Sequence, residues 1–173
     1  MSNSLIESAK TYTQSLLQGC KDYPYHNPAH SISVLDRATY IAMAEDVNNV
    51  DLEDLQLACL FHDTGFSEQY EKNEHIGARI ARTWLEEKNH PKERIEKIEK
   101  IIMATVLFST PHSHLENIIQ DADLDNIGTK SEFTFSQNYL TELRSVGGKN
   151  ISDCAYWQFV YKLLTKYKFH TDT

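Results

Sequence analysis

The stretch LACLFHDTGF, residues 57–66, joins a dense apolar run to a His-Asp pair and a glycine. Its apolar residues predict a helix from about Asp51 to Asp63 whose last turn packs against the core, and Gly65 is a natural residue just after a helix. This helix delivers His62 and Asp63 to the interior, where a carboxylate is costly unless it is paired or bound to a cation. Two interpretations follow: a metal site, or a carboxylate that accepts hydrogen bonds from amides at the helix end.

A second stretch, YPYHNPAHSISVL at residues 23–35, places His26 and His30 on either side of an Asn-Pro pair. Asn27 suits an N-cap and Pro28 the first helical position, so the pattern predicts a helix that begins here. His30 then lies in the first turn and His26 just outside it. The two imidazoles fit either an active site or an ordinary capped helix start.

Most of the remaining chain shows the three-to-four-residue apolar spacing of amphipathic helices. The segments that carry a helical pattern are residues 5–20, 32–42, 51–63, 76–84, 95–105 and 115–128, the last closed by Gly128. Residues 108–114 are expected to form a loop, and the glycines at 147–148 separate two final helices. No alternating strand pattern of useful length occurs. The predicted fold class is therefore all-α, a compact single-domain bundle of about eight helices.

The composition is that of an ordinary globular protein, because 40% of the 173 residues are hydrophobic and 24% are charged. A formal net charge of -8 provides no broad basic surface for a nucleic-acid polymer or an anionic membrane. Cys20, Cys59 and Cys154 are odd in number and far apart, which favours buried thiols in a reducing compartment. The first residues show no signal-peptide pattern and no apolar run approaches a membrane span, so we expect a cytoplasmic protein.

Residues that can carry chemistry lie at the ends of separate predicted helices. They are His30, the pair at 62–63 and the acidic stretch DADLD at 121–125. Imidazole and carboxylate donors without thiolates suit one divalent transition metal such as Mn, Fe, Ni, Co or Zn, and Mg is also compatible. Asp121 and Asp123 point about 200° apart on a helix, so only one of them can face a metal.

Taken in order, these motifs resemble the HD superfamily of metal-dependent phosphohydrolases. YHNPAH is similar to the first motif, LACLFHDTGF to the second, NEHIGARIARTWL to the next helix and DADLDNIG to the last. The C-terminal WQFVYKLLTKYKFHT resembles the tail of a small bacterial subgroup. The resemblance implies one HD domain over residues 1–173, with a metal-binding core at about 22–128 and C-terminal helices at about 130–170 packed on it.

The same resemblance assigns ligands. It implies a metal held by His30, His62, Asp63 and Asp123. Asp121 then braces a neighbouring helix or caps a backbone, and Asp125 lies at the surface.

The YHN motif is also similar to the metal-site motif of cyclic-nucleotide phosphodiesterases, in which the first His protonates the leaving oxygen. Carried over, His26 is a general acid, with a loop His that satisfies the cap as the alternative. The resemblance makes His75 a phosphate contact, with Lys72 and Arg79 as nearby cations. A second metal is disfavoured, because Thr105 stands where a further His is expected.

Two loop histidines leave a second metal site possible. His112 and His114 lie beyond Thr105 and are the residues that would replace the missing ligand.

The function implied is hydrolysis of a small phosphate ester, such as a nucleotide or cyclic nucleotide, by metal-activated water, with Asp63 orienting or deprotonating the water. The partner is thus a small phosphorylated substrate rather than a nucleic-acid polymer or a membrane, and the oligomeric state stays open. Two alternatives remain: a non-haem di-iron oxygenase of the same superfamily, and a non-catalytic regulatory domain that binds nucleotide or metal.

Overall fold

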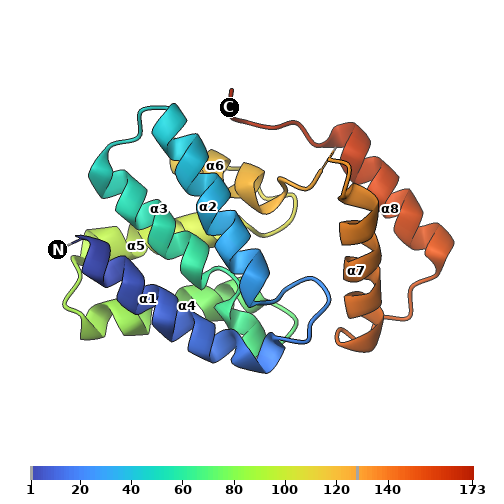
Figure 1. Ribbon diagram of the computed structural model, residues 1–173, viewed down its shortest axis with the longest axis horizontal. Helices are drawn as coiled ribbons and strands as arrows, with labels where there is room; N and C mark the ends of the chain where they lie inside the picture. The colour runs from blue at the N-terminus through green and yellow to red at the C-terminus, as the bar shows by residue number, and fades with distance from the viewer. Residues whose placement is uncertain (1, 128) are drawn as a thin grey trace.

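The computed structural model describes residues 2–127 and 129–173, which form a bundle of helices (Figure 1). The α-helices are α1 (Ser2–Leu17), α2 (Pro28–Ala44), α3 (Asn49–Phe61), α4 (Asn73–Glu87), α5 (Lys92–Met103), α6 (His114–Asp123), α7 (Glu132–Ser145) and α8 (Asp153–Lys166). Two short 3-10 helices span Gln18–Cys20 and Thr64–Ser67. The described residues contain no strand, so the predicted all-α class is confirmed.

Helix α3 lies at the centre of the bundle. It packs against α1, α2, α5 and α6, while α4 covers α5 and the 3-10 helix Thr64–Ser67. The apolar side chains of α1 to α6 form the main core, which includes Phe61 and Leu60 at the end of α3. Helices α7 and α8 lie to one side of this group (Figure 1) and share a smaller core around Leu140, Tyr156 and Val160.

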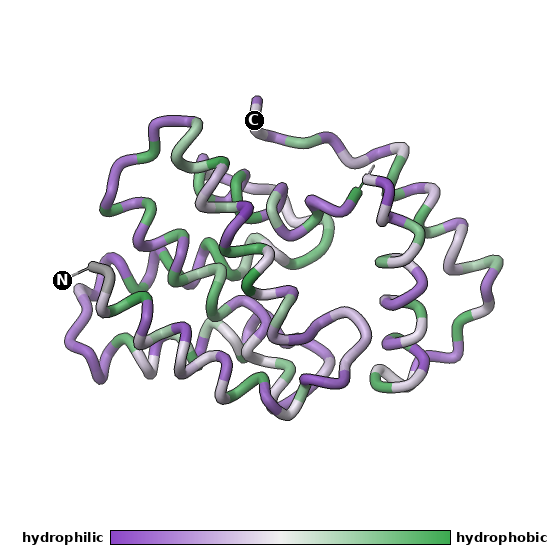
Figure 2. Tube along the Cα trace, in the orientation of Figure 1, coloured by the Kyte–Doolittle hydropathy of each residue, from purple (hydrophilic) through white to green (hydrophobic). Residues whose placement is uncertain are grey.

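Apolar and hydrophilic residues alternate along the helices, as Figure 2 shows. This is the pattern of amphipathic helices that bury one side. In the part of the chain that the structure describes, no helix is both long enough and apolar enough to cross a membrane.

The start of α2 follows the sequence pattern. The Asn27 side chain accepts hydrogen bonds from the amides of Ala29 at 3.0 Å and His30 at 3.2 Å, and Pro28 occupies the first helical position. The cap fixes where the first turn begins, so His30 is held on α2 while His26 stays in the preceding segment, as predicted.

Two predicted helix ends were wrong. Helix α3 ends at Phe61 rather than Asp63, because the Thr64 hydroxyl donates to the Phe61 carbonyl at 2.7 Å and the chain tightens into a 3-10 turn. Helix α6 ends at Asp123, where Leu124 and the next residues bond back in short turns. The expected closing residue, Gly128, lies outside the described residues.

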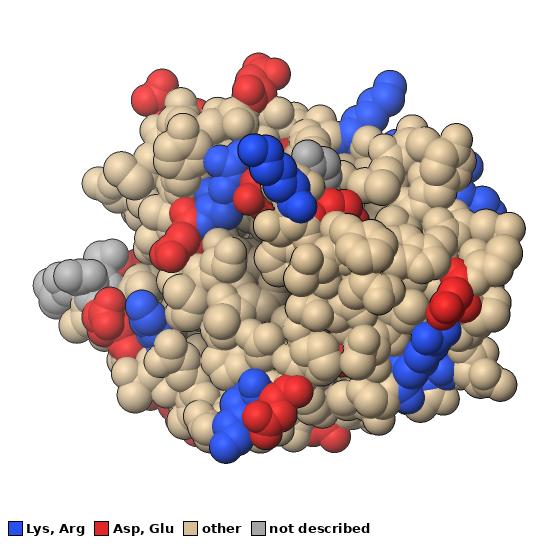
Figure 3. Space-filling model, turned by 45° about the vertical axis from the view of Figure 1, so that its right-hand side comes forward, with Lys and Arg blue, Asp and Glu red and all other residues tan. Residues whose placement is uncertain are grey.

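On the face drawn in Figure 3, several Lys or Arg side chains lie beside Asp or Glu, and other charged side chains of either sign stand apart in small groups. Most of that face is uncharged. It carries no continuous basic surface of the kind that a nucleic-acid backbone requires.

Two glycines allow the turn after α3 to approach α4 closely. A Cβ on Gly77 would lie 2.8 Å from the carbonyl oxygens of Phe61 and His62, and a Cβ on Gly65 would lie 1.9 Å from the carbonyl oxygen of Asn73. Both distances are shorter than any real Cβ contact. The position of His62 and Asp63 therefore depends on the absence of side chains at these two positions.

Replacing Gly77 with Ala should move α4 away from the His-Asp turn and lower the free energy of unfolding by roughly 1–3 kcal/mol, the usual effect of overpacking. Denaturant unfolding of the purified variant measures this loss. Gly19→Ala is the matched control, because nothing lies within 4 Å of a Cβ there. Equal stability of the two variants would contradict the close-packing argument.

Candidate metal centre and cavity

Three predicted ligands from three separate helices meet in the structure. The ligand atoms of His30, His62 and Asp123 lie within 4.8 Å of one another. Asp123 Oδ1 is 3.0 Å from His30 Nε2 and 3.7 Å from His62 Nε2. Donors that bind one ion at about 2.0–2.2 Å stand roughly 3–3.5 Å apart in tetrahedral or octahedral geometry, so this spacing fits a single metal ion.

Asp63 completes this group from the turn after α3. Its Oδ2 atom lies 3.2 Å from His62 Nε2 and 3.6 Å from His30 Nε2. Both His62 Nε2 and Asp63 Oδ2 are buried and lack a hydrogen-bond partner. Because buried polar atoms are normally satisfied, two orphaned donor atoms that face the same point fit a bound cation.

The orientation of His62 is fixed from behind. Its Nδ1 atom lies 2.7 Å from the carbonyl oxygen of Cys59, which selects the tautomer that donates there. The Nε2 atom is then directed toward Asp63 and Asp123. A hydrogen bond of this kind, on the nitrogen away from the ion, is typical of histidine metal ligands.

The charges in this group perturb one another strongly. Burial lowers the pKa of His62, but the carboxylates of Asp63 and Asp123 outweigh it and raise that pKa well above the ordinary value. Burial raises the pKa of Asp123, but its hydrogen bond with His30 and the nearby His62 imidazole lower that pKa by more, so the net shift is downward. The site therefore keeps its carboxylates ionised, as a metal ligand set requires.

Asp121 points away from this group and binds the end of the chain. Its carboxylate accepts hydrogen bonds from the Tyr167 hydroxyl at 2.8 Å, from the amides of His170 and Thr171 at 2.8 Å, and from the Thr171 hydroxyl at 2.9 Å. Asp121 is 1% exposed. Its side chain fixes the C-terminal tail onto α6, while Asp125 pairs with Arg37 at 2.6 Å and is partly exposed.

His26 is held by a carboxylate from α7. Glu142 Oε1 lies 2.5 Å from His26 Nδ1. Its Oε2 atom accepts hydrogen bonds from the backbone amides of Tyr25 and His26, each at 2.8 Å. Tyr70 donates its hydroxyl to Oε1 at 3.1 Å, and the His26 ring stacks on Phe66. Burial lowers the pKa of His26, but the hydrogen bond with Glu142 and the negative charges of Asp63, Glu142 and Asp123 together outweigh burial and raise that pKa above its ordinary value.

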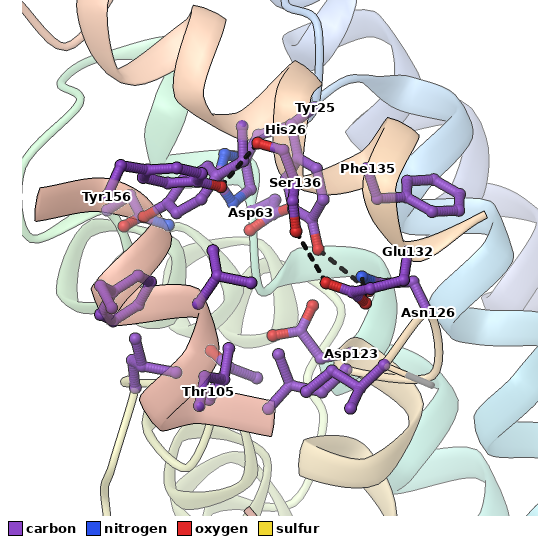
Figure 4. Close-up of a pocket in the computed structure, with 18 of the residues that line it drawn as sticks. Tyr25, His26, Asp63, Thr105, Asp123, Asn126, Glu132, Phe135, Ser136 and Tyr156 are labelled. Atoms are coloured by element: carbon purple, nitrogen blue, oxygen red, sulfur yellow. Dashed lines mark hydrogen bonds between the residues drawn. The ribbon is translucent and has the colours of Figure 1, made fainter. Parts of the chain in front are cut away.

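A cavity of about 190 Å³ opens beside the metal group, between the main bundle and the α7–α8 pair. Figure 4 shows the carboxylates of Asp63, Asp123 and Glu132 around the same space, with His26 and Tyr25 at its edge. Its aromatic lining comes from both sides of the molecule: Tyr25, Phe66, Tyr70, Phe135, Tyr139, Tyr156 and Phe159. The cavity can therefore place an aromatic group next to the metal-binding residues.

The three predicted substrate contacts on α4 lie elsewhere. Lys72, His75 and Arg79 are exposed, and none of them is among the described residues that line the cavity. Arg79 pairs with Glu68 at 2.6 Å in solvent. Small and apolar residues turn the inner side of α4 toward the bundle. His75 and Arg79 on its outer side, and Lys72 just before the helix, therefore lie away from the cavity.

The residues named as substitutes for a missing second-metal ligand also lie apart. Thr105 lines the cavity, but His112 and His114 lie in a separate groove near the start of α6, where His114 pairs with Glu45 at 3.1 Å. Asp123 is the last residue of α6, whereas His114 is its first residue and His112 precedes the helix. Among the described residues, His30, His62 and Asp123 are the only three ligand-type side chains gathered this closely.

Glu142 was not singled out from the sequence. It is fully buried and reaches His26 across 116 residues of chain. The available signal was weak: on α7, Glu142 lies three residues after Tyr139 and beside Leu143, within the stripe of residues that packs inward. An acidic residue in such a stripe indicates a buried partner.

Comparisons with known proteins identify one family and two solved structures with a similar fold. A family model described as HD domain matches residues 29–125, more than half of the chain. The crystal structure of a predicted HD superfamily hydrolase from an uncultured Thermotogales bacterium has a TM-score of 0.61 and 21% identity, covering 92% of this chain and 89% of that one. Bacillus subtilis YpgQ in complex with ADP has a TM-score of 0.57 and 20% identity over 99% of both chains. No curated protein sequence matches the chain.

Removing any one of the four proposed metal ligands should greatly lower the amount of bound metal. We expect His30→Ala, His62→Ala, Asp63→Ala and Asp123→Ala to lower bound metal severalfold or more, because loss of a ligand removes a large share of the affinity. Elemental analysis of the purified proteins after dialysis against Mn²⁺ measures the content.

Asp121→Asn is the matched control for this series, since it alters a carboxylate two residues from Asp123 that faces the C-terminal tail. It should keep its metal. A result in which the Asp121 variant loses metal while the Asp123 variant retains it would reverse the assignment.

Proposed function

Since the chain belongs to the HD-domain family, we propose that it is a metal-dependent phosphohydrolase that acts on a small phosphate ester, a nucleotide or cyclic nucleotide. One observation carries the proposal. The ligand atoms of His30, His62 and Asp123 gather within 4.8 Å of one another, and Asp63 Oδ2 lies 3.2 Å and 3.6 Å from the two imidazoles. Two of these buried atoms have no hydrogen-bond partner, and Asp63 and Asp123 line an aromatic cavity.

A divalent ion held by His30, His62, Asp63 and Asp123 supplies Lewis acidity toward a phosphoryl oxygen and lowers the pKa of water. Asp63 has a second task in this proposal. A carboxylate offers two oxygens, so Asp63 can face the imidazoles with Oδ2 and hold the attacking water with the other. It lines the cavity while only 5% exposed, which keeps that interaction away from bulk solvent.

His26 supplies the proton for the leaving oxygen. Because Glu142 engages Nδ1, the Nε2 atom of the same ring is left for the substrate, and His26 lines the cavity. Burial lowers the pKa of His26, but Glu142, Asp63 and Asp123 together raise it above its ordinary value, which favours the protonated form that a general acid needs. Glu142 acts through His26 and is a positioning residue.

The aromatic lining supports a substrate with a ring. Seven aromatic side chains line the cavity, and aromatic faces stack well on planar groups such as nucleobases. Bacillus subtilis YpgQ, which shares the fold, was crystallised with ADP. A nucleotide is thus the phosphate ester that best fits the chemistry of the cavity.

A screen of phosphate release tests this function directly. Nucleotides, cyclic nucleotides and sugar phosphates should be incubated with the protein and with Mn²⁺, Co²⁺, Ni²⁺ or Mg²⁺ added separately, and metal should be counted per chain. Release that depends on added metal, with one ion per chain, supports the proposal. Two irons per chain would favour the oxygenase, and tight nucleotide binding without release would favour a regulatory domain.

His26→Ala should keep its metal yet lose roughly 10²-fold to 10⁴-fold in turnover on substrates with an alkoxide leaving group, the usual span for a general acid. A nitrophenyl ester needs little protonation of its leaving group, so most of the rate should return there. Steady-state rates on both substrate types, with metal content, measure the difference.

Other outcomes for His26→Ala assign other roles. Equal losses on both substrates would point to positioning of the substrate, and loss of metal would make His26 a ligand. An unchanged rate would leave His26 as a loop residue that supports the cap of α2.

Glu142→Gln should reproduce the same pattern more weakly, with a loss of about tenfold or more on alkoxide esters and little change on nitrophenyl esters, because the ring of His26 loses its anionic partner. Glu87→Gln, an exposed change of the same kind on α4, is the control. A folding defect would lower both rates together, so a uniform loss would argue against the positioning role.

A further inference from the structure

The cavity is unusually acidic for a site that receives a phosphate ester. Its described lining contains four carboxylates, Asp63, Glu74, Asp123 and Glu132, and no Lys or Arg. A divalent ion at the metal centre would offset Asp63 and Asp123. Glu74 and Glu132 would remain as negative charges without a Lys or Arg in the described lining to offset them, and the His26 imidazole of that lining is already paired with Glu142. The cavity therefore disfavours a second anionic group near these two carboxylates.

Glu132 is fixed in this wall by two hydrogen bonds. Ser136 donates its hydroxyl to Oε1 at 2.7 Å, and the Asn126 amide donates to Oε2 at 3.2 Å. The Tyr25 hydroxyl in turn donates to Asn126 Oδ1 at 3.3 Å. Figure 4 shows this chain of polar groups across the cavity from Asp63 and next to Asp123. The carboxylate is thus held in place by its neighbours before any ligand arrives.

A fixed carboxylate has capacity left for a ligand. An ionised carboxylate accepts about four hydrogen bonds, and Glu132 receives two from Ser136 and Asn126. The remaining acceptor sites can receive N–H or O–H groups only, because the oxygens donate nothing. Such donors occur on the sugar hydroxyls and the amino or imino groups of a nucleoside. Tyr25 and Phe135 beside them offer ring faces to a base.

We infer that Glu132 determines substrate specificity by accepting a hydrogen bond from the uncharged nucleoside end of the substrate and by excluding a second phosphate from that end. The inference rests on the proposed phosphohydrolase function and narrows it. The substrate class is a nucleoside 5′-phosphate with free sugar hydroxyls. A nucleoside 3′,5′-bisphosphate would bring its extra charge against Glu132 and Glu74, and ribose 5-phosphate would leave the aromatic walls without a partner.

The test compares three probes on the metal-loaded protein: adenosine 5′-monophosphate, adenosine 3′,5′-bisphosphate and ribose 5-phosphate. We expect release of the 5′-phosphate with a KM that is lowest for the monophosphate and roughly tenfold or more higher for the other two, as for a site with one charged hydrogen bond or one repelled charge. Glu132→Gln should raise the KM for the monophosphate and narrow its advantage over the bisphosphate. Glu87→Gln, the exposed control, should change neither ratio.

The outcomes separate this inference from the function on which it rests. Phosphate release with equal KM values for all three probes in the unaltered protein would overturn the role of Glu132 and leave the phosphohydrolase intact. An unchanged monophosphate-to-bisphosphate ratio in a folded Glu132→Gln protein would also overturn it.

Absence of release from every probe would count against the function instead, and equilibrium binding of the same probes to the Mn²⁺-loaded protein would then decide the specificity. Tighter binding of the monophosphate than of the bisphosphate, reduced by Glu132→Gln, supports the inference. Equal binding of both nucleotides overturns it.

Discussion

The burial of carboxylates among imidazoles at the end of α3 is the constraint on which the rest of the structure depends. Asp63 is 5% exposed, and its nearest charged neighbours are His62 and His30. Ionised carboxylates are stable there only because the imidazoles, or a cation that replaces their protons, compensate the charge. The ends of α2, α3 and α6 must meet at one point for this to happen, and each helix is arranged to bring one donor there.

Close backbone packing makes that meeting point rigid. Gly77 lets α4 pass close to the carbonyl groups of Phe61 and His62. The Cys59 carbonyl accepts a hydrogen bond from Nδ1 of His62. The helix that carries the His-Asp pair is therefore held from its own last turn and from α4 at once. A donor set fixed in this way loses little conformational freedom when a metal binds.

The α7–α8 pair completes the site from outside the residues that match the HD domain. Glu142 on α7 binds the backbone amide and the ring of His26. Asp121 on α6 accepts hydrogen bonds from backbone amides in the segment after α8. The pair and the tail that follows it are thus attached to the bundle by two buried carboxylates. The metal donors come from the bundle, whereas Glu132, Phe135 and Tyr139 in the opposite wall come from the pair. In the proposed function, this division would place the metal chemistry on one side of the cavity and the recognition of the substrate on the other.

The sequence by itself determined the helical class, the cap that starts α2 and the family, because these depend on spacing, capping and motif order within short stretches. It also reduced the acidic stretch to a choice between Asp121 and Asp123, since a helix turns them to opposite sides. Only the tertiary structure decided which side faces His30 and which faces the C-terminal tail. The same holds for Lys72, His75 and Arg79, which were expected at the substrate and lie in solvent, and for Glu142 and Glu132, which no local pattern marked. Glu142 contacts a residue 116 positions away in the chain, and the other positions depend on which side of a helix faces the cavity. Both are set by how helices pack rather than by the residues on either side.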